Sequence, residues 1–377
     1  MRENGQSIDS RIDGLVNELT ARGAMGEGWR EAMHAAPRHL FLPYVAWAMP
    51  YGQPAHVIDR HSDAAGWLGA AYADHPVVTQ VDDGRTDIRE AETGNCFSSS
   101  LSAPGAVMSF LDLLSPYSGD KVLEVGTGTG WTAALLSHRV GETNVTSIEI
   151  DETVSAIAAE NLKLAGHSPR LMVGDGLAGY PEGAPYDRVH VTCGVYEIPY
   201  SWVEQTRPGG LIVLPWSPPF ESGHNLALTV TNKGTAVGRF SGGSSYMMAR
   251  SQRHPDKPPL VQGRRSETAA DSRRILRAGY GADVTIAALM PGVWSEYEYD
   301  QSSMTLRLWD PNSLALIEGS DVHQYGERSL WDELEDAFFA WVEWGSPDRD
   351  RFGMTVTPEG QFVWHDTPDN PVAGHTR

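Results

Sequence analysis

The sequence predicts an open α/β sheet with helices before it and a small α+β module after it. Between residues 121 and 214, short apolar strand patterns alternate with helix patterns of about a dozen residues. The residues after 277 carry apolar helix and hairpin patterns of their own. Strands that alternate with helices pair in parallel through right-handed crossovers, so the first region should form a parallel sheet covered by helices.

The N-terminal region predicts three helices. The first begins after the capping residue Ser7, ends at Gly23 and carries an apolar face of Ile12, Leu15, Val16 and Leu19. The other two cover residues 28–36 and 103–114. Residues 52–97 are polar and rich in turn-forming residues, and they predict turns.

The alternating region predicts five strands and two helices. The strands are expected over residues 121–125, 144–150, 170–173, 186–192 and 210–214, and the helices over 131–140 and 153–165. Further on, residues 329–341 place their apolar side chains along one helix face. The segments 353–357 and 361–364 flank a short loop containing glycine, which predicts a hairpin.

A basic segment suggests a domain boundary. Residues 250–277 hold eight basic side chains against three acidic ones, whereas residues 278–377 hold five arginines against 18 carboxylates. Prolines in 254–259 interrupt regular structure there. We therefore predict a catalytic domain over 1–250 and an extension over 251–377. The basic segment is either a solvated linker or a surface that holds an acidic substrate.

The overall composition excludes several classes of protein. The chain has 29 basic and 49 acidic residues and a net charge of −20, which argues against duplex nucleic acid and anionic membranes as partners. Two cysteines, Cys96 and Cys193, allow one disulfide at most and no metal framework, so no metal is expected. The sequence shows neither a signal peptide nor an apolar run of about 18 residues. We expect a cytoplasmic protein.

A glycine-rich turn marks the candidate site. Glu124 ends the first strand, and Gly126, Thr127, Gly128 and Gly130 lead into the next helix. Glycines at alternate positions let a ligand approach the backbone, and the helix N-terminus offers N–H groups to an anionic group.

Two acidic residues follow in the same order as the strands. Glu149 ends the second strand, where a carboxylate can accept both hydroxyls of a ribose. Asp175 and Gly176 follow the third strand, in position to contact an adenine. Ordinary surface carboxylates at strand ends are the alternative, but spacing and order agree at all three positions.

The spacing of the glycines narrows the choice of ligand. Gly-x-Gly-x-Gly differs from the dinucleotide-binding fingerprint, and no lysine follows as it does in a phosphate-binding loop. A ligand with a ribose and a carboxylate but no phosphate fits better. S-adenosylmethionine has this inventory, and its product would be S-adenosylhomocysteine.

From about residue 10 to 250 the sequence resembles the protein-L-isoaspartate (D-aspartate) O-methyltransferase family. The segments that carry the resemblance are 37–43, 71–77, 100–104, 122–132, 186–192, 197–199, 205 and 207–210. The resemblance implies a Rossmann-like, seven-stranded methyltransferase fold. It also implies methyl transfer to a carboxylate of a peptide or protein substrate that presents an aspartyl or isoaspartyl residue.

Carried over position by position, the resemblance places the active-site serine on Ser102 and the cofactor acids on Glu124, Glu149 and Asp175. An Asp-derived carboxylate is ionised at neutral pH, so it needs no general base and the enzyme acts mainly by positioning. Ser102 would then orient the carboxylate or the cofactor. Alternatively, Ser102 only caps the helix that begins at Ala103. We assign structural roles to His39, His190 and Cys193.

Two departures from the family concern the substrate. The stretch before the serine motif is longer than expected and ends in Ser98, Ser99 and Ser100, whose hydroxyls are candidate substrate contacts. The extension over 251–377 has no counterpart in the ordinary repair enzyme, which suggests that it recognises a peptide.

These departures favour one branch of the family over the others. An extended branch methylates an aspartate in ribosomally synthesised, post-translationally modified peptides, and the ester then closes to an aspartimide. We favour this function. Repair of isoaspartyl residues in damaged proteins is the second hypothesis, and a non-catalytic module that binds isoaspartyl residues or peptides is the third. The sequence leaves the oligomeric state open.

Overall fold

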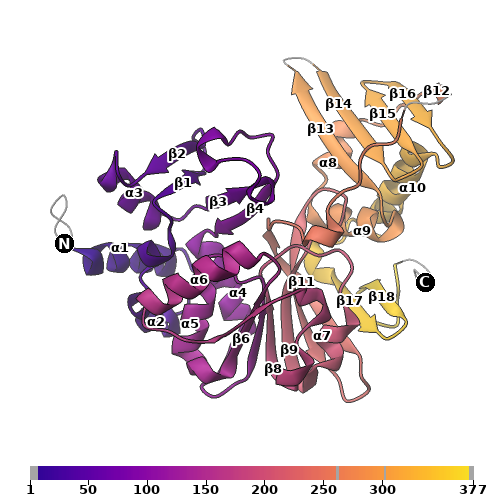
Figure 1. The fold of residues 1–377 in the computed structure, drawn as a ribbon. Coiled ribbons are helices and arrows are strands. Elements are labelled where there is room, and N and C mark those ends of the chain that lie inside the picture. The colour runs from indigo at the N-terminus through magenta and orange to yellow at the C-terminus, as the bar shows by residue number, and fades with distance from the viewer. Residues whose placement is uncertain (1–6, 260–262, 301–302, 373–377) are drawn as a thin grey trace. The chain divides into compact units, whose positions relative to one another are not determined.

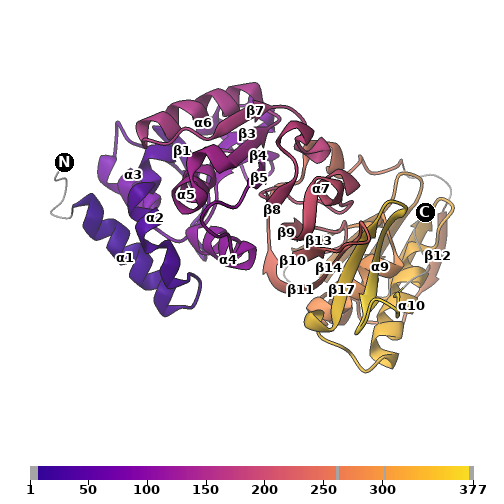
Figure 2. The same cartoon turned by 90° about the horizontal axis from the view of Figure 1, so that it is seen from below.

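A computed structural model describes residues 7–259, 263–300 and 303–372 (Figures 1 and 2). Internal contacts divide the chain into two compact units, Met1–Cys193 with Glu204–Val213, and Gly194–Val203 with Leu214–Arg377. Contacts thus group part of the predicted catalytic domain with the extension, and the domain assignment from sequence remains a prediction. Within the described ranges, no helix is both long and apolar enough to cross a membrane.

The first unit begins with the predicted helices. Ser7 caps α1 (Ile8–Ala21), since its side chain accepts a hydrogen bond from the Ser10 amide at 3.2 Å. Ile12, Leu15, Val16 and Leu19 are buried, as their spacing predicts. The second helix, α2 (Arg30–Ala35), is shorter than expected because residues 27–29 form a 3-10 turn. Helices α1 and α2 lie side by side in both views (Figures 1 and 2).

Residues 45–101 form a four-stranded antiparallel sheet, and the prediction of turns over 52–97 is therefore incomplete. The strand order is β2-β1-β3-β4, and α3 packs beside β2 (Figure 1). Strand β2 is a four-residue segment with little apolar alternation, so its pairing with β1 rather than its own pattern fixes its conformation. The elements are β1 (Val45–Ala48), β2 (His56–Asp59), α3 (Ala64–Ala71), β3 (Val77–Val81) and β4 (Phe97–Leu101).

The central sheet confirms the predicted α/β alternation. Its strand order is β18-β17-β11-β10-β9-β8-β5-β6-β7, and the pairs β8–β5, β5–β6, β6–β7 and β8–β9 are parallel. The last of the predicted strands is longer than expected and begins at Thr206. The elements are α4 (Pro104–Leu114), β5 (Val122–Val125), α5 (Trp131–Val140), β6 (Val145–Glu149), α6 (Glu152–Leu164), β7 (Arg170–Val173), β8 (Tyr186–Val191) and β9 (Thr206–Trp216).

The second unit contains antiparallel strands of the central sheet and a separate sheet. Strand β11 pairs with β10 on one edge and with β17 on the other, and β17 and β18 form the predicted hairpin. These elements are α7 (Tyr200–Glu204), β10 (Gly223–Val230), β11 (Ala236–Ser244), β17 (Phe352–Thr357) and β18 (Gly360–His365).

The separate sheet has five strands in the order β12-β16-β15-β14-β13, and α10 packs on it (Figure 1). Together with α8, α9 and α10 it forms a C-terminal α+β module, of which the sequence indicated only α10. The predicted hairpin, which the sequence analysis counted with this module, belongs to the central sheet instead. The elements are β12 (Gly263–Glu267), α8 (Ser272–Leu276), α9 (Tyr280–Leu289), β13 (Trp294–Asp300), β14 (Ser303–Trp309), β15 (Leu314–Glu318), β16 (Asp321–Tyr325) and α10 (Leu330–Glu343).

Several cations of the basic segment pair with carboxylates of this module. Arg264 bonds Asp332 and Arg265 bonds Asp321, each at 2.7 Å. Arg273 bonds Asp271 at 2.9 Å, and Lys257 bonds Glu296. Three arginines that could have held an acidic peptide thus already have carboxylate partners within their own module.

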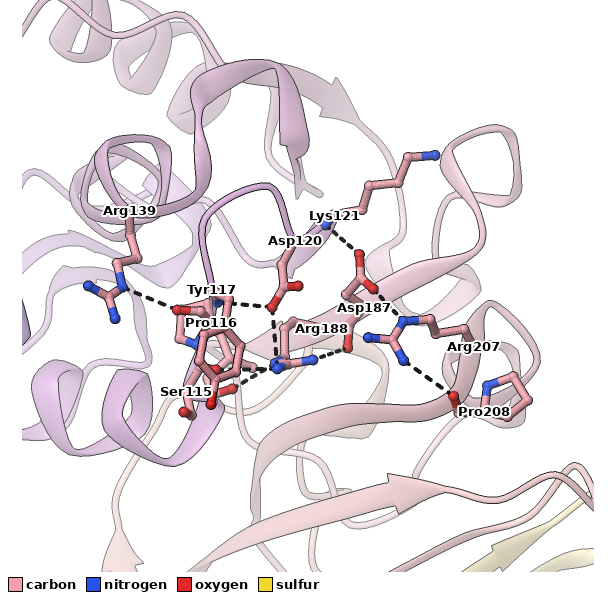
Figure 3. A network of polar contacts seen from close by, with 11 residues as sticks. Ser115, Pro116, Tyr117, Asp120, Lys121, Arg139, Asp187, Arg188, Arg207 and Pro208 are labelled. Atoms are coloured by element: carbon pink, nitrogen blue, oxygen red, sulfur yellow. Dashed lines mark hydrogen bonds and ion pairs between the residues drawn. The ribbon is translucent and has the colours of Figure 1, made fainter.

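A buried arginine joins the end of α4 to the central sheet (Figure 3). Arg188 on β8 is 8% exposed and donates hydrogen bonds to the carbonyls of Leu114 at 2.9 Å and Ser115 at 3.3 Å. It also pairs with Asp120 at 3.3 Å. Ser115 ends the helix in the left-handed region at φ 43°, so its carbonyl turns away from the helix axis and needs an external donor.

We predict that Arg188→Gln destabilises the protein by about 2–4 kcal/mol, because it leaves Asp120 and two helix-end carbonyls without their cation. The shift in the urea midpoint of the full chain measures this effect. Arg207→Gln is the matched control, since Arg207 lies in the same network and bonds Asp187 but is exposed (Figure 3). Equal shifts for the two variants would contradict the assignment of Arg188 as a structural anchor.

Candidate active site

The glycine turn lies between β5 and α5. Gly126, Gly128 and Gly130 adopt φ values of 92°, 54° and 90°, a region that residues with a Cβ rarely enter. The Thr192 hydroxyl donates to the Gly126 carbonyl at 2.6 Å, and a side chain at Gly126 would collide with that hydroxyl. The turn therefore requires glycine for both its conformation and its packing.

Glu149 and Asp175 lie at the carboxyl ends of neighbouring parallel strands. Glu149 ends β6 opposite Val173 of β7, and Asp175 follows two residues after Val173. The Glu149 carboxylate is 9% exposed and accepts hydrogen bonds from the Gly128 amide at 2.9 Å and the Asp151 amide at 3.1 Å. Asp175 is exposed and accepts from the Leu177 amide at 3.0 Å. The structure thus brings Glu149 directly against the glycine turn.

Glu124 reaches the turn through a chain of buried hydroxyls. Ser147 donates to Glu124 Oε2 at 2.5 Å, and the Thr127 and Ser147 hydroxyls are 2.6 Å apart. Complete burial raises the pKa of Glu124 to about 8, and the nearby Glu149 charge acts in the same direction. The role of Ser147 was not predicted, because a serine inside a strand has no neighbouring motif that indicates a functional contact.

Gly176 and Gly130 are positions where little room is left. Gly176 is buried, and a Cβ there would lie 2.6 Å from Val125 Cγ1 on β5. A Cβ at Gly130 would lie 3.2 Å from Leu162 of α6. Gly130 is also the N-cap of α5, and it has no side chain that could bond the N–H groups of the helix. The N-cap of α5 therefore contributes no side chain that competes for the N–H groups of its first turn.

Ser102 lies between β4 and α4, and the alternative that it caps this helix is wrong. The N-cap is Ala103, which has no side-chain cap bond, and the Asp74 carboxylate accepts from the Gly105 amide at 2.7 Å instead. Ser102 is half-buried, and its hydroxyl has no hydrogen-bond partner among the described residues. That hydroxyl is therefore available to a ligand.

The three serines before Ser102 have different surroundings. Ser98 Oγ donates to Gln80 at 2.8 Å and accepts from the Asp83 amide at 3.1 Å. Ser99 is 7% exposed and accepts from the Thr79 hydroxyl at 3.1 Å. The Ser100 carbonyl lies 3.6 Å from where a Cβ of Gly128 would be. Ser98 and Ser99 thus serve the β3–β4 hairpin, Ser100 borders the glycine turn, and their contact with a substrate stays a prediction.

The unexpectedly long stretch before the serines is an ordered connection between β3 and β4. The Asp82 carboxylate accepts hydrogen bonds from the Thr86 hydroxyl and the Asn95 amide group at 2.7 Å each, and from the Cys96 amide at 2.9 Å. Gln80 Nε2 donates to Asp151 Oδ2 at 3.2 Å. Since the Asp151 amide bonds Glu149, this hairpin is tied to the same end of β6 as the glycine turn.

Arg38 holds the segment that carries Ser102. Its guanidinium is 1% exposed and donates to the carbonyls of Ala70, Ala71, Ala73, His75, Leu101 and Ser102, the last at 3.0 Å. It also stacks over Trp131, the first residue of α5, at 5.4 Å. Burial lowers the pKa of Arg38 to about 9, which leaves it charged at neutral pH. No local sequence pattern indicates that this arginine is buried.

The two histidines and the cysteine that were assigned structural roles have pKa values shifted by burial. His39 Nδ1 lies 2.6 Å from the Tyr72 hydroxyl, and burial lowers its pKa. His190 is 1% exposed, and burial lowers its pKa to about 4. Burial and the charges of Glu149 and Asp175 raise the pKa of the Cys193 thiol to about 12. Among the described residues, no group of three His, Cys, Asp or Glu side chains could hold a metal ion.

These residues fit S-adenosylmethionine. Glu149 lies where a ribose next to the turn would be bonded, and the uncapped start of α5 offers N–H groups to a carboxylate. No lysine or arginine stands in the turn to bind a phosphate. A ribose and an amino acid carboxylate, without a phosphate, match this set of donors and acceptors.

The fold is that of Rossmann-like, S-adenosylmethionine-dependent methyltransferases. A solved structure described as a protein-L-isoaspartate O-methyltransferase aligns with 94% of this chain and 100% of its own, with a TM-score of 0.54 and 21% identity. The sequence profile of the protein-L-isoaspartate(D-aspartate) O-methyltransferase family matches residues 10–246. The chain belongs to this family.

Two archaeal relatives illustrate the extent of the match. A protein-L-isoaspartate O-methyltransferase of Methanopyrus kandleri is 35% identical over 219 residues, which cover 57% of this chain and 80% of the relative. One of Methanosarcina mazei is 34% identical over 187 residues, which cover 49% of this chain. The chain spans 62% of the length of the Methanosarcina protein. The family profile leaves the residues after 246 unmatched.

Glu124 predicts an unusual dependence of stability on pH. Its pKa of about 8 in the folded state exceeds the ordinary 4.5, so the folded protein keeps a proton that the unfolded chain releases. Stability should therefore fall as the pH rises through this window. Between the ordinary pKa of 4.5 and the folded-state pKa of about 8, the stability of Glu124→Gln relative to wild type should rise by up to about 1.4 kcal/mol per pH unit. Above pH 8 this difference in stability should stay constant. Denaturation of the cofactor-free proteins between pH 5 and 9 tests this.

Glu160→Gln, at an exposed position of α6, is the control and should not change the pH dependence. A pH-independent difference between Glu124→Gln and wild type would show that Glu124 does not retain its proton.

We predict that Glu149 contributes strongly to the affinity for the cofactor. Replacing it with alanine removes a carboxylate that would bond both ribose hydroxyls, a loss of about 10- to 100-fold in affinity. Calorimetric titration with S-adenosylhomocysteine measures the effect. Glu152→Ala, at an exposed position in the first turn of α6, should bind like wild type. Equal affinities for Glu149→Ala and wild type would mean that the ribose binds elsewhere.

Proposed function

We propose that this protein transfers the methyl group of S-adenosylmethionine to the carboxylate of an Asp-derived residue in a peptide or protein. The observation that carries the proposal is the arrangement around the glycine turn. Glu149 bonds the turn, and the carbonyl of Ser100, two residues before Ser102, borders it. The family and the names of its relatives support the same activity.

The chemistry demands little from the protein beyond positioning. The bound cofactor would supply an electrophilic methyl group on a sulfonium, and a carboxylate oxygen of the substrate would form the new bond as the sulfur–methyl bond breaks. The substrate is already ionised, so no proton moves. The unpartnered Ser102 hydroxyl would donate a hydrogen bond that orients the carboxylate, and Arg38 would fix the Ser102 backbone.

For the substrate we propose an aspartyl side chain in a modified ribosomal peptide, whose methyl ester closes to an aspartimide. Methanol leaves a tetrahedral intermediate more readily than hydroxide, so the ester activates the side chain toward the next backbone nitrogen. The extension after residue 246, which the family profile does not match, supports a dedicated substrate. The expectation that this extension has no counterpart in the repair enzyme was wrong, because a solved protein-L-isoaspartate O-methyltransferase aligns with 94% of the chain.

Repair of isoaspartyl residues is the second candidate. The names of the two relatives favour it, since each is called a protein-L-isoaspartate O-methyltransferase. In this case the enzyme would accept many unrelated short peptides that contain isoaspartate, and the extension would serve another purpose.

Paired peptides that differ only in Asp or isoAsp distinguish the candidates. We expect the full chain with labelled S-adenosylmethionine to methylate the aspartyl form of a constrained peptide encoded beside its gene, followed by loss of methanol. Mass spectrometry detects both steps, and Glu149→Ala, whose cofactor binding should be weakened, is the control with reduced activity. Methylation confined to isoAsp in unrelated peptides would establish repair instead. If cofactor binds but no peptide is methylated, the chain is a binding module.

A further inference from the structure

The loop that follows β8 is held by residues beyond the match to the family profile. This loop, residues 194–199, contains the Glu197-Ile198-Pro199 sequence that resembles the family pattern. It leaves the carboxyl end of β8, whose neighbour β5 leads into the glycine turn. Thr192, two residues before the loop, bonds the carbonyls of Val125 and Gly126. In open α/β sheets, ligands bind outside the carboxyl ends of the strands, so the course of this loop matters for a substrate.

Gln252 binds one side of the loop. Its Oε1 accepts hydrogen bonds from the amides of Tyr196 at 2.8 Å and Glu197 at 3.0 Å. Its Nε2 donates to the Glu197 carbonyl at 2.8 Å. The side chain is 7% exposed, so these bonds are shielded from water. Its amide group satisfies backbone groups of the loop that a neighbouring strand would otherwise bond.

Gln361 on β18 binds the adjacent groups. Its Oε1 accepts from the Ile198 amide at 2.7 Å, and its Nε2 donates to the Tyr196 carbonyl at 2.6 Å. The same carbonyl accepts from Trp216 Nε1 at 3.0 Å. The Tyr196 ring packs edge-on against Trp294 of β13 at 5.8 Å.

Together the two glutamines accept from three successive amides, those of Tyr196, Glu197 and Ile198. A loop without regular structure would otherwise leave these amides to water or unpaired. Both glutamines lie beyond residue 246, where the match to the family profile ends. The extension thus supplies the hydrogen bonds that fix a loop belonging to the family part of the chain.

We propose that Gln252 and Gln361 are positioning residues, through which the C-terminal extension fixes the loop over 194–199 in the conformation that receives the peptide substrate. This inference rests on the proposed function. It gives the extension a specific task, which is to hold this loop in one conformation. The glutamines act through the loop backbone, so they should affect peptide binding more than cofactor binding.

The test uses Gln252→Met, Gln361→Met and the double variant in the full chain. Methionine keeps the length of the side chain but removes its amide group. For the peptide methylated by wild type, we expect KM to rise about tenfold or more in the double variant, with kcat changed less than about twofold. The Kd for S-adenosylhomocysteine should stay within about twofold of wild type.

Hydrogen exchange gives a readout that does not depend on catalysis. The amides of Tyr196, Glu197 and Ile198 should exchange faster in the variants, because they lose their acceptors. Gln252→Glu and Gln361→Glu keep the acceptor but lose the donor. These glutamate variants should show a KM between those of wild type and the methionine variants. If the methionine variants fold poorly, the same measurements are made on the glutamate variants.

Gln324→Met is the matched control within the extension. Gln324 on β16 is 5% exposed, accepts from the Trp331 amide at 2.9 Å and donates to Asp332 at 3.0 Å, but it does not touch the loop. It should lower Tm without changing the KM or the exchange of the loop amides.

Three outcomes decide the proposal. Faster loop exchange together with a raised KM supports it. Unchanged exchange or an unchanged KM in the double variant overturns it, as does an equal rise of KM in Gln324→Met. If wild type methylates no peptide, the proposed function fails separately, and hydrogen exchange still decides whether the glutamines hold the loop.

Discussion

The arrangement of the candidate active site depends on one buried cation, Arg38. A charge away from water must be compensated, and here backbone carbonyls rather than a hydrogen-bonded carboxylate perform this task. The carbonyls come from the end of α3, the approach to β3 and the junction after β4, while Trp131 lies under the guanidinium. The same side chain thus contacts both the backbone of Ser102 and the first residue of α5, the helix after the glycine turn. Because the bonded groups belong to the backbone, neighbouring side chains can vary without loss of this organisation.

An acidic protein that accepts a carboxylate must limit electrostatic repulsion. Cations of the basic segment offer little help, because Arg264, Arg265 and Arg273 pair with carboxylates of their own module. Uncharged donors such as the Ser102 hydroxyl are better suited, since they bind an anion without also attracting the nearby acids. The raised pKa of Glu124 keeps one further negative charge out of the centre of the sheet below pH 8.

Local sequence patterns predicted the central part of this structure, and long-range contacts explain what they missed. The alternation over 121–214, the glycine turn and the strand-end position of Glu149 depend on residues close in the chain, so they could be derived from sequence. Strand β2 forms only because β1 pairs with it, and Ser102 does not cap α4 because Asp74, distant in sequence, does so. Nothing in the local sequence distinguishes Gln252 or Gln361 from any polar surface residue. Their roles follow from contacts across more than fifty residues.

The pairing of β11 with β17 has a consequence for biosynthesis. Gly238 pairs with Met354, which is synthesised 354 − 238 = 116 residues later. The edge of β11 therefore stays unpaired until β17 has been translated. At translation rates of about 5–20 residues per second, the interval is on the order of ten seconds. During it, the nascent chain exposes the unpaired N–H and C=O groups of a sheet edge, which invite pairing with other chains. The protein completes this sheet only when its last strands leave the ribosome, and its yield in a cell should depend on what shields β11 until then.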